Sequence, residues 1–241
     1  YIPPTPHDGG LTLGAAQYVW HHVLDNERCV WEDNFTPYLG RTYSKESVLA
    51  ALKEKSEKVN QTEATDSDVI ALLDSQKIVS VFGGGSESGR RALGSRSILA
   101  DPRSDKMKDL INEKVKHRQW YRPFAPSMLR EKVEDWFTRD DDSPYMNIVL
   151  NFKDDKKDLV PAVVHVDGTA RVQTVTENDN GWYYNFIKKW NEKTNVPIVL
   201  NTSFNDREPI CETPAHALNC YLGTDIDYLY FYDYNILVEK K

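Results

Sequence analysis

Residues 83–97 have the sequence GGGSESGRRALGSRS, directly after the apolar, β-branched run KIVSVF at 77–82. The run is typical of a buried strand, and the glycines that follow allow the backbone to turn sharply and to approach a ligand closely. Three arginines then come within seven residues, Arg90, Arg91 and Arg96. An arginine keeps its charge, and its planar fork matches phosphate oxygens in pairs. The stretch therefore predicts an anion site at the end of a strand, with phosphate as the simplest ligand.

The basic residues of the chain are concentrated around this stretch. The formal net charge is −7, yet residues 86–130 contain eleven Lys/Arg against five Asp/Glu, so they carry +6 and the remainder carries −13. Two like charges about 7 Å apart repel by roughly 2 kcal/mol at an effective dielectric of 20, so cations gathered in one pocket favour a bound anion. The alternative is a solvated basic face. It suits the lysines of the helix predicted at 105–116 better than Arg91 and Arg96, which small and apolar residues surround.

Helical and strand patterns interleave along the chain, which predicts an α/β or α+β fold with a mixed sheet. Helices are expected at about 45–59, 69–73, 105–116, 131–137 and 182–193, with another starting at Thr213-Pro214, and an N-terminal one ending near Leu24. Strands are expected at 76–82, 97–100, 145–152, 196–200, 228–232 and 236–239, with a hairpin formed by 162–166 and 170–175.

A second basic stretch, KHRQWYRPFAP at 116–126, is predicted to be an extended loop because Pro123 and Pro126 exclude a continuous helix. Lys116 and Arg122 are placed to hold phosphates, whereas Trp120 could stack on a base. The alternative for Trp120 is packing in a surface loop, and for this residue alone we favour packing.

Two later segments add polar groups to strands. Arg171 alternates with apolar residues and shares a strand face with Gln173, so it needs an anionic partner, either a protein carboxylate or a ligand. Asn201 and Ser203 directly follow the strand predicted at 196–200. Short amide and hydroxyl side chains there can bind a ligand, but they are also ordinary turn formers.

Other chemistry finds little support. The patterns CxxC, HExxH and GxxxxGK[ST] do not occur, and the three cysteines, Cys29, Cys211 and Cys220, have neither disulfide nor zinc spacing, so they are interpreted as reduced thiols of a cytoplasmic protein. No apolar run approaches the length of a membrane span. A site for a triphosphate would need Mg²⁺, and Glu87 is the nearest carboxylate in the sequence. Asp8, before paired glycines, is either a metal or phosphate contact or an ordinary turn residue.

Three separated motifs resemble the O-carbamoyltransferases of the nodulation and antibiotic-tailoring type. They are GSESGRRALGSRSILA at 85–100, Lys116 together with RPFAP at 122–126, and LNTSFN at 200–205. The likeness extends over essentially the whole chain. Arg90 departs from the family motif, which usually has proline at this position, so the local loop geometry is left open.

The resemblance implies a twisted, YrdC-like mixed sheet with flanking helices and a basic concave pocket at 42–241. Residues 1–41 would be the tail of a preceding kinase-like domain and a linker. It implies formation of carbamoyl adenylate from carbamoyl phosphate and ATP, followed by transfer of the carbamoyl group to a hydroxyl of a small molecule in the missing kinase-like domain, which carries iron. Asp8 would be one iron ligand.

The resemblance also assigns residues to the pocket. Those expected to bind ATP and carbamoyl phosphate are Arg91, Arg96, Lys116, Arg122, Arg171, Asn201 and Ser203, with Arg91, Lys116 and Arg122 as catalytic groups. Two further hypotheses remain. The domain could bind a nucleotide or RNA without chemistry, although the acidic remainder of the chain disfavours nucleic acid. The chain could also be folded but inactive without the preceding domain.

Overall fold

The computed structural model describes residues 5–6, 8–28 and 36–241. Within these residues nine strands form one mixed sheet in the order β1-β9-β8-β2-β3-β7-β4-β6-β5. The pairs β2–β8 and β4–β6 are parallel, and the other neighbours are antiparallel. The strands are β1 Val59–Glu63, β2 Val79–Phe82, β3 Arg96–Ala100, β4 Ala125–Leu129, β5 Ile148–Asn151, β6 Thr169–Val175, β7 Ile198–Ser203, β8 Tyr228–Phe231 and β9 Ile236–Lys240.

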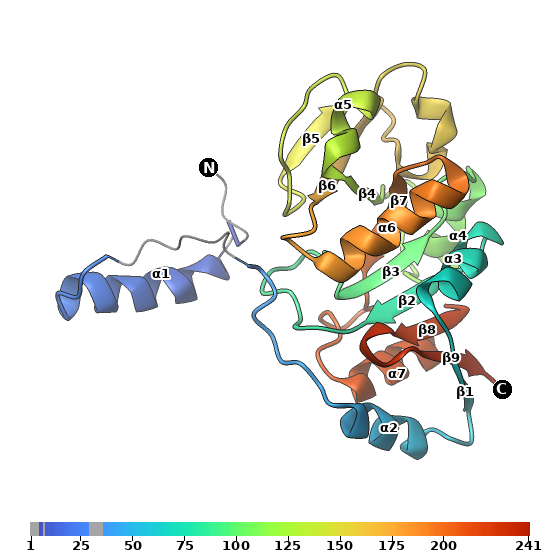
Figure 1. The fold of residues 1–241 in the computed structure, drawn as a ribbon, viewed down its shortest axis with the longest axis horizontal. Helices are drawn as coiled ribbons and strands as arrows, with labels where there is room; N and C mark the ends of the chain where they lie inside the picture. The colour runs from blue at the N-terminus through green and yellow to red at the C-terminus, as the bar shows by residue number, and fades with distance from the viewer. Residues whose placement is uncertain (1–4, 7, 29–35) are drawn as a thin grey trace.

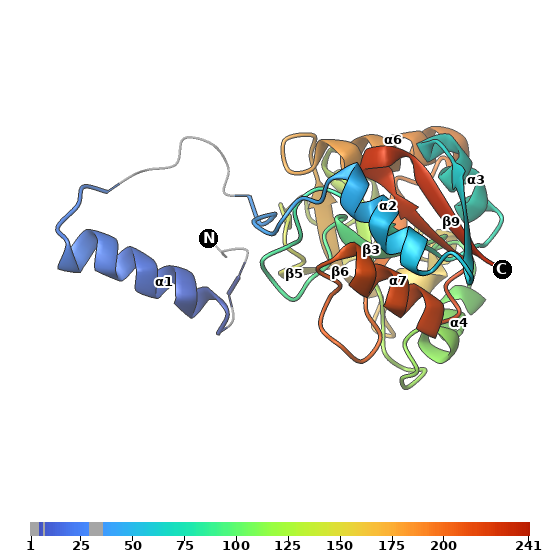
Figure 2. The ribbon, with the colours of Figure 1, turned by 90° about the horizontal axis from the view of Figure 1, so that it is seen from below.

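Helices cover both faces of the sheet (Figures 1 and 2). One buried cluster packs α2, α4, α5 and α7 against one face, and a second cluster packs α3 and α6 against the other. The alternation of strand side chains produces this division, because neighbours such as Ile98 and Leu99 point to opposite clusters. The helices are α2 Lys45–Glu54, α3 Asp66–Asp74, α4 Lys106–Lys114, α5 Val133–Trp136, α6 Gly181–Thr194 and α7 Pro214–Gly223.

Helices α2 and α7 begin at the capping residues that the sequence predicts, and the side chains of these residues form the cap hydrogen bonds. Ser44 accepts a hydrogen bond from the Ser47 amide at the start of α2, and Thr213 does the same for α7 with Pro214 as the first helical residue. Such caps satisfy amide groups that the first helical turn leaves unpaired. Most predicted helices and strands are therefore confirmed, as is the α/β class with a mixed sheet.

Three local predictions are wrong. The helix expected to reach residue 59 ends at Glu54, and β1 begins at Val59. The extended loop predicted at 116–126 ends earlier, because strand β4 begins at Ala125. The hairpin around Asp167-Gly168 does not form, because residues 161–163 make a short 3₁₀ turn and β6 pairs instead with β5 and β4. In each case pairing with strands distant in sequence determines the outcome, and local patterns do not contain that information.

The N-terminal helix α1, Gly10–Tyr18, continues into one π-helical turn at Val19–Val23. It buries none of its residues, and both views show it apart from the sheet (Figures 1 and 2). The helix expected near Leu24 is thus present, while the domain boundary at 41/42 stays a prediction. Among the described helices, none is both long enough and apolar enough to cross a membrane.

Candidate functional site

The glycine- and arginine-rich stretch forms a loop between β2 and β3 that is organised by a buried carboxylate. Glu87 accepts hydrogen bonds through Oε1 from the backbone amides of Leu93 (2.8 Å), Ser95 (2.8 Å) and Arg96 (3.2 Å). Three amides converging on one oxygen hold the loop in a fixed curve. Glu87 does not line the cavity described below. Its observed role is to shape the loop rather than to face a metal ion.

Close backbone approach explains two of the glycines. Gly94 has φ +114°, and a Cβ there would lie 2.4 Å from the ring of Tyr183. A Cβ on Gly85 would lie 2.7 Å from the carbonyl oxygen of Tyr38. Only glycine fits such contacts without displacing a neighbour. The loop is therefore packed between α6 and the segment that precedes α2.

That preceding segment, residues 36–41, is part of the scaffold of the loop. Gly40 donates its amide hydrogen to the Ser86 carbonyl (2.9 Å), and Ser88 donates to the Pro37 carbonyl (2.7 Å). The Tyr38 hydroxyl donates to the Leu93 carbonyl at 2.8 Å. The resemblance places this segment within the tail and linker expected at residues 1–41. Residues 37, 38 and 40 are hydrogen-bonded to the loop between β2 and β3, so the segment supports that loop directly.

A cavity of about 380 Å³ opens beside this loop. Five arginines from three parts of the chain line it: Arg90 and Arg91 from the loop, Arg118 and Arg122 from the α4–β4 connection, and Arg171 from β6. Asn201 and Ser203 of β7 complete one side. The antiparallel pairing of β3 with β7 and of β7 with β4 brings these segments together. Of the predicted site residues, Arg91, Arg122, Arg171, Asn201 and Ser203 thus surround one cavity.

No protein carboxylate compensates these arginines in the part of the chain that the structure describes. None of the ion pairs found there involves any of the five. The cations also disfavour one another. Burial, and then the neighbouring Arg91, lower the pKa of Arg171 to about 10. Burial, and then Arg122 and Arg171, lower the pKa of Arg118 to about 10. Such a cavity favours an anionic ligand.

Two buried polar atoms of the cavity residues have no hydrogen-bond partner among the described atoms. The Asn201 amide nitrogen donates to the Ala92 carbonyl (3.0 Å), to Ser127 Oγ (2.9 Å) and to Gln173 Oε1 (3.2 Å). The Ala92 carbonyl can only accept, so it fixes the orientation of the amide and leaves Oδ1 as a buried, unused acceptor. Arg171 Nε is a buried, unused donor. The cavity residues therefore include one buried acceptor and one buried donor that no described protein group satisfies.

Lys116 is hydrogen-bonded to the end of β7, next to the cavity. Its ammonium donates to Ser203 Oγ (3.3 Å), to the Asn205 carbonyl (2.7 Å) and to Asn205 Oδ1 (2.9 Å), but it does not line the cavity. Burial, and then the charge of Arg118, lower its pKa to about 8. Lys116 thus holds the end of β7 in place, which makes it a positioning residue rather than a direct ligand in this conformation.

Arg96 also lies outside the cavity, which corrects the expectation of a direct contact. Its side chain is fully buried over the ring of Phe82, 3.6 Å from the centroid, and donates to the carbonyls of Gly83 (2.6 Å) and Ser95 (2.9 Å). These bonds tie the start of the loop to its end. The sequence indicated that Arg96 is not a solvated surface residue, but its two terminal nitrogens donate to carbonyls of the loop backbone rather than to a ligand.

Two other predicted residues, Trp120 and Asp8, do not line the cavity, and one lining residue was not predicted. Packing of Trp120 is wrong, because its side chain is 71% exposed and meets Tyr121 edge-on. Asp8 is exposed and belongs to no group of three potential ligands among the described residues. The other iron ligands were expected outside this chain, so the role of Asp8 stays a prediction. The sequence interpretation missed Arg118 as a lining residue, although it stands in the flagged stretch 116–126 between Lys116 and Trp120.

Comparison with known proteins places this arrangement in a family. The family described as Carbamoyltransferase C-terminus matches residues 70–240. Nodulation protein NolNO of Sinorhizobium fredii is 40% identical over 248 residues, covering 100% of this chain and 36% of that protein. Nodulation protein NolO of Bradyrhizobium diazoefficiens is 38% identical over 234 residues, covering 94% of this chain and 42% of that protein.

The relatives are longer than this chain. An uncharacterized protein of Methanocaldococcus jannaschii, MJ1058, is 39% identical over 248 residues, and the match covers 40% of its length. The chain thus spans between 36% and 42% of the length of these three relatives. Among solved structures, HypF of T. kodakarensis superimposes with a TM-score of 0.48 at 18% identity, over 76% of this chain and 23% of that one.

Proposed function

We propose that this chain, which belongs to the carbamoyltransferase C-terminus family, makes carbamoyl adenylate from carbamoyl phosphate and ATP for transfer of the carbamoyl group to a hydroxyl. One observation carries the proposal. A single cavity combines five arginines that lack carboxylate partners with a buried, unused amide oxygen. Phosphate oxygens match the arginines, and the amino group of a carbamoyl moiety matches the amide oxygen.

The reaction balances only if water takes part. Water first cleaves carbamoyl phosphate between phosphorus and the bridging oxygen, which yields carbamate and inorganic phosphate. A carbamate oxygen then attacks the α-phosphorus of ATP, the bond to the bridging oxygen breaks, and pyrophosphate leaves with that oxygen. Both steps build negative charge on phosphoryl oxygens, and fixed cations stabilise such charge.

The cavity residues have distinct roles in this proposal. Arg91 and Arg122 neutralise phosphoryl oxygens, while the free Nε of Arg171 donates one directed hydrogen bond. Asn201 Oδ1 accepts from the carbamoyl amino group and thereby orients the carbon. Lys116 keeps Ser203 and the end of β7 in position. No carboxylate is among the lining residues, so these residues do not supply a Mg²⁺ site.

The final transfer is assigned to the rest of the protein. The acceptor hydroxyl would attack the carbamoyl carbon, lose its proton and release AMP. The chain spans less than half the length of its relatives, and its described residues do not assemble an iron site around Asp8. We therefore propose that acceptor binding and iron belong to a preceding kinase-like domain.

Pyrophosphate release tests the adenylation step directly. With carbamoyl phosphate and ATP, the chain should form AMP-containing product and pyrophosphate, and omission of carbamoyl phosphate should abolish both. Arg122→Met should reduce the rate by more than about 100-fold, because it removes a charge-assisted contact made to developing charge. Arg139→Met is the matched control, since Arg139 is 65% exposed and paired with Asp141. Equal rates in the Arg122 and Arg139 variants would refute the assignment.

If the chain alone is inactive, the activity of the full-length parent protein distinguishes an incomplete site from incorrect chemistry. Absence of product from the chain alone, together with carbamoyl-phosphate-dependent product from the full-length parent, would mean that the missing portion completes the site. Absence of product from both would contradict the proposed chemistry.

A binding module without chemistry is the second candidate, and the exposed pair Trp120 and Tyr121 favours it. Trp120 is 71% exposed, Tyr121 is 62% exposed, and Lys108 lies 5.9 Å from the Trp120 ring. Such rings can stack on bases. This candidate predicts RNA affinity that falls steeply with salt, that is lost in Trp120→Ala, and that is accompanied by no pyrophosphate release.

A further inference from the structure

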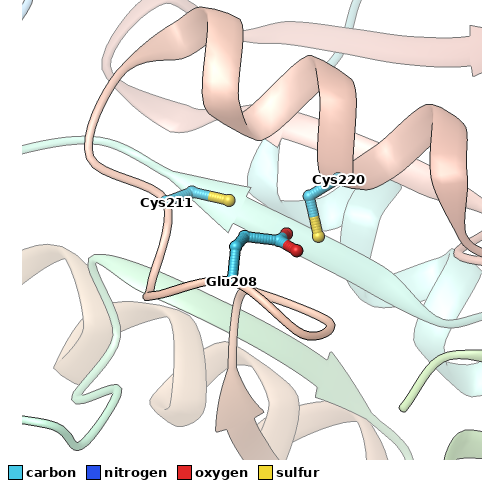
Figure 3. Close-up of side chains that lie close together, drawn as sticks. All are labelled: Glu208, Cys211 and Cys220. Atoms are coloured by element: carbon cyan, nitrogen blue, oxygen red, sulfur yellow. The ribbon is translucent and has the colours of Figure 1, made fainter. Parts of the chain in front are cut away.

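A compact group of metal-binding side chains lies outside the arginine cavity. Glu208 and Cys211 belong to the connection between β7 and α7, and Cys220 lies on α7 itself. One carboxylate oxygen and the two sulfur atoms all lie within 4.8 Å of one another. Figure 3 shows the three side chains pointing toward one another across the loop. Both cysteines are buried, whereas Glu208 is exposed.

The spacing of these atoms is close to what a tetrahedral ion requires. With zinc–sulfur bonds of about 2.3 Å, two ligands at the tetrahedral angle lie about 3.8 Å apart. The donor atoms of the cluster therefore need to approach one another by only about 1 Å. A cavity of about 540 Å³, lined by Glu208, Cys220 and His216 among others, adjoins the cluster. It leaves room for water as a fourth ligand.

Backbone hydrogen bonds already hold the loop in the required shape. Cys211 donates its amide hydrogen to the Phe204 carbonyl (3.0 Å), and Asn205 Nδ2 donates to the Glu208 carbonyl (2.7 Å). The Glu208 carboxylate in turn accepts from the amide of Arg207 at 3.2 Å. Ligands fixed by such bonds lose little freedom when an ion binds.

We propose that Glu208, Cys211 and Cys220 bind a thiophilic divalent metal ion, with zinc as the natural occupant. On binding, each thiol releases one proton to solvent, and the ion is held by two thiolates and one carboxylate. No electron is transferred. Two thiolates favour zinc over Mg²⁺ or Ca²⁺, which prefer oxygen ligands. The site is structural, because it joins the β7–α7 loop to the helix.

The loop between β7 and α7, which the ion would join to α7, is also hydrogen-bonded to Lys116. Asn205 accepts from the Lys116 ammonium through both its carbonyl (2.7 Å) and its Oδ1 (2.9 Å). Ser203, which lines the arginine cavity, lies two residues earlier. A bound ion is therefore expected to order 204–211 without contacting the cavity.

Metal content and stability of the 241-residue chain test the proposal. Protein purified with zinc and then passed through a desalting column should retain one ion per chain. Zinc at about 100 times its dissociation constant should raise Tm by roughly 5 °C or more over chelator-treated protein. Cobalt should give a thiolate-to-metal charge-transfer band. Bound zinc should protect Cys211 and Cys220 from alkylation, as measured by mass spectrometry of peptides.

Single substitutions show whether the cobalt band and zinc binding depend on Glu208 and Cys220. Cys220→Ser should reduce the cobalt charge-transfer band by at least about half, because one of two thiolates is lost, and Glu208→Gln should weaken zinc binding about 10-fold or more, as expected for a lost metal ligand. Because Glu208 is exposed, that variant keeps the test valid if the buried cysteine variant does not fold. Asn219→Ala is the control, since Asn219 lines the same cavity and is exposed.

Three results would overturn the proposal. The first is zinc that leaves Tm and alkylation unchanged. The second is binding that Glu208→Gln and Asn219→Ala affect equally. The third is a disulfide between Cys211 and Cys220 in protein prepared without oxidant. The third cysteine, Cys29, lies outside the described residues, so its alkylation is followed separately.

Discussion

Replacing Arg171 with methionine should change stability and ligand binding in opposite directions. The guanidinium lies among other arginines, and its pKa falls to about 10 because of burial and then Arg91. This fall below the ordinary value corresponds to roughly 3 kcal/mol against the charged form. Arg171 is half-buried, so solvent screening reduces this to about 1–2 kcal/mol. Without anions, we expect Arg171→Met to raise the free energy of unfolding by that amount.

Ligand binding should respond in the opposite sense. A hydrogen bond to a charged group contributes about 1.5–3 kcal/mol, so the affinity for inorganic phosphate or carbamoyl phosphate should fall roughly 10- to 100-fold. Urea denaturation in buffer free of phosphate and sulfate measures the first effect, and titration calorimetry measures the second. Arg139→Met should change neither beyond about 0.5 kcal/mol, because exposed ion pairs contribute little. Lower stability of the Arg171 variant, or unchanged phosphate affinity, would refute the description of an uncompensated anion site.

Three further perturbations test other parts of the site. The pKa of Lys116 is about 8 in the folded chain and about 10.5 in the unfolded chain. Between these two pH values the unfolded chain keeps a proton that the folded chain has lost, so the free energy of unfolding rises with pH. Wild type should therefore gain about 2–3 kcal/mol over Lys116→Met as pH rises from 7 to 10, measured by denaturation in chelator. Asn201→Ala should lower carbamoyl phosphate affinity about 10-fold more than phosphate affinity, because only the former presents an amino group to Oδ1; an equal loss in calorimetry contradicts this role. Gly94→Ala should lower the free energy of unfolding by on the order of 3 kcal/mol, because the backbone there is left-handed and the new Cβ would clash with the Tyr183 ring. Gly181→Ala is the control and should not lower Tm, since a Cβ at Gly181 meets nothing within 4 Å.

Local sequence patterns were sufficient for much of the architecture. The apolar run before the glycines predicted β2, and capping residues such as Ser44 and Thr213 predicted where α2 and α7 begin. These features depend on contacts within a few residues, so the sequence displays them directly. Strand β4 and the partners of β6 were not predicted, because they depend on pairing between distant segments.

The site divides in the same way. The residue types and their neighbours in the sequence indicated that Arg91, Arg122 and Arg171 could bind an anion, because the charge of an arginine does not depend on the fold. The zinc hypothesis was not accessible from sequence, since Cys211 and Cys220 lack a recognised spacing and come together only when α7 packs beside the loop that precedes it.

By itself, the sequence therefore determined the secondary-structure class, the family and the presence of clustered cations. The tertiary structure decided which cations face a common cavity. It turned Arg96 inward onto loop carbonyls and placed Lys116 behind the end of β7. The reason is physical: a residue's charge is local, whereas its burial and its hydrogen-bond partners depend on segments that meet only in the folded sheet.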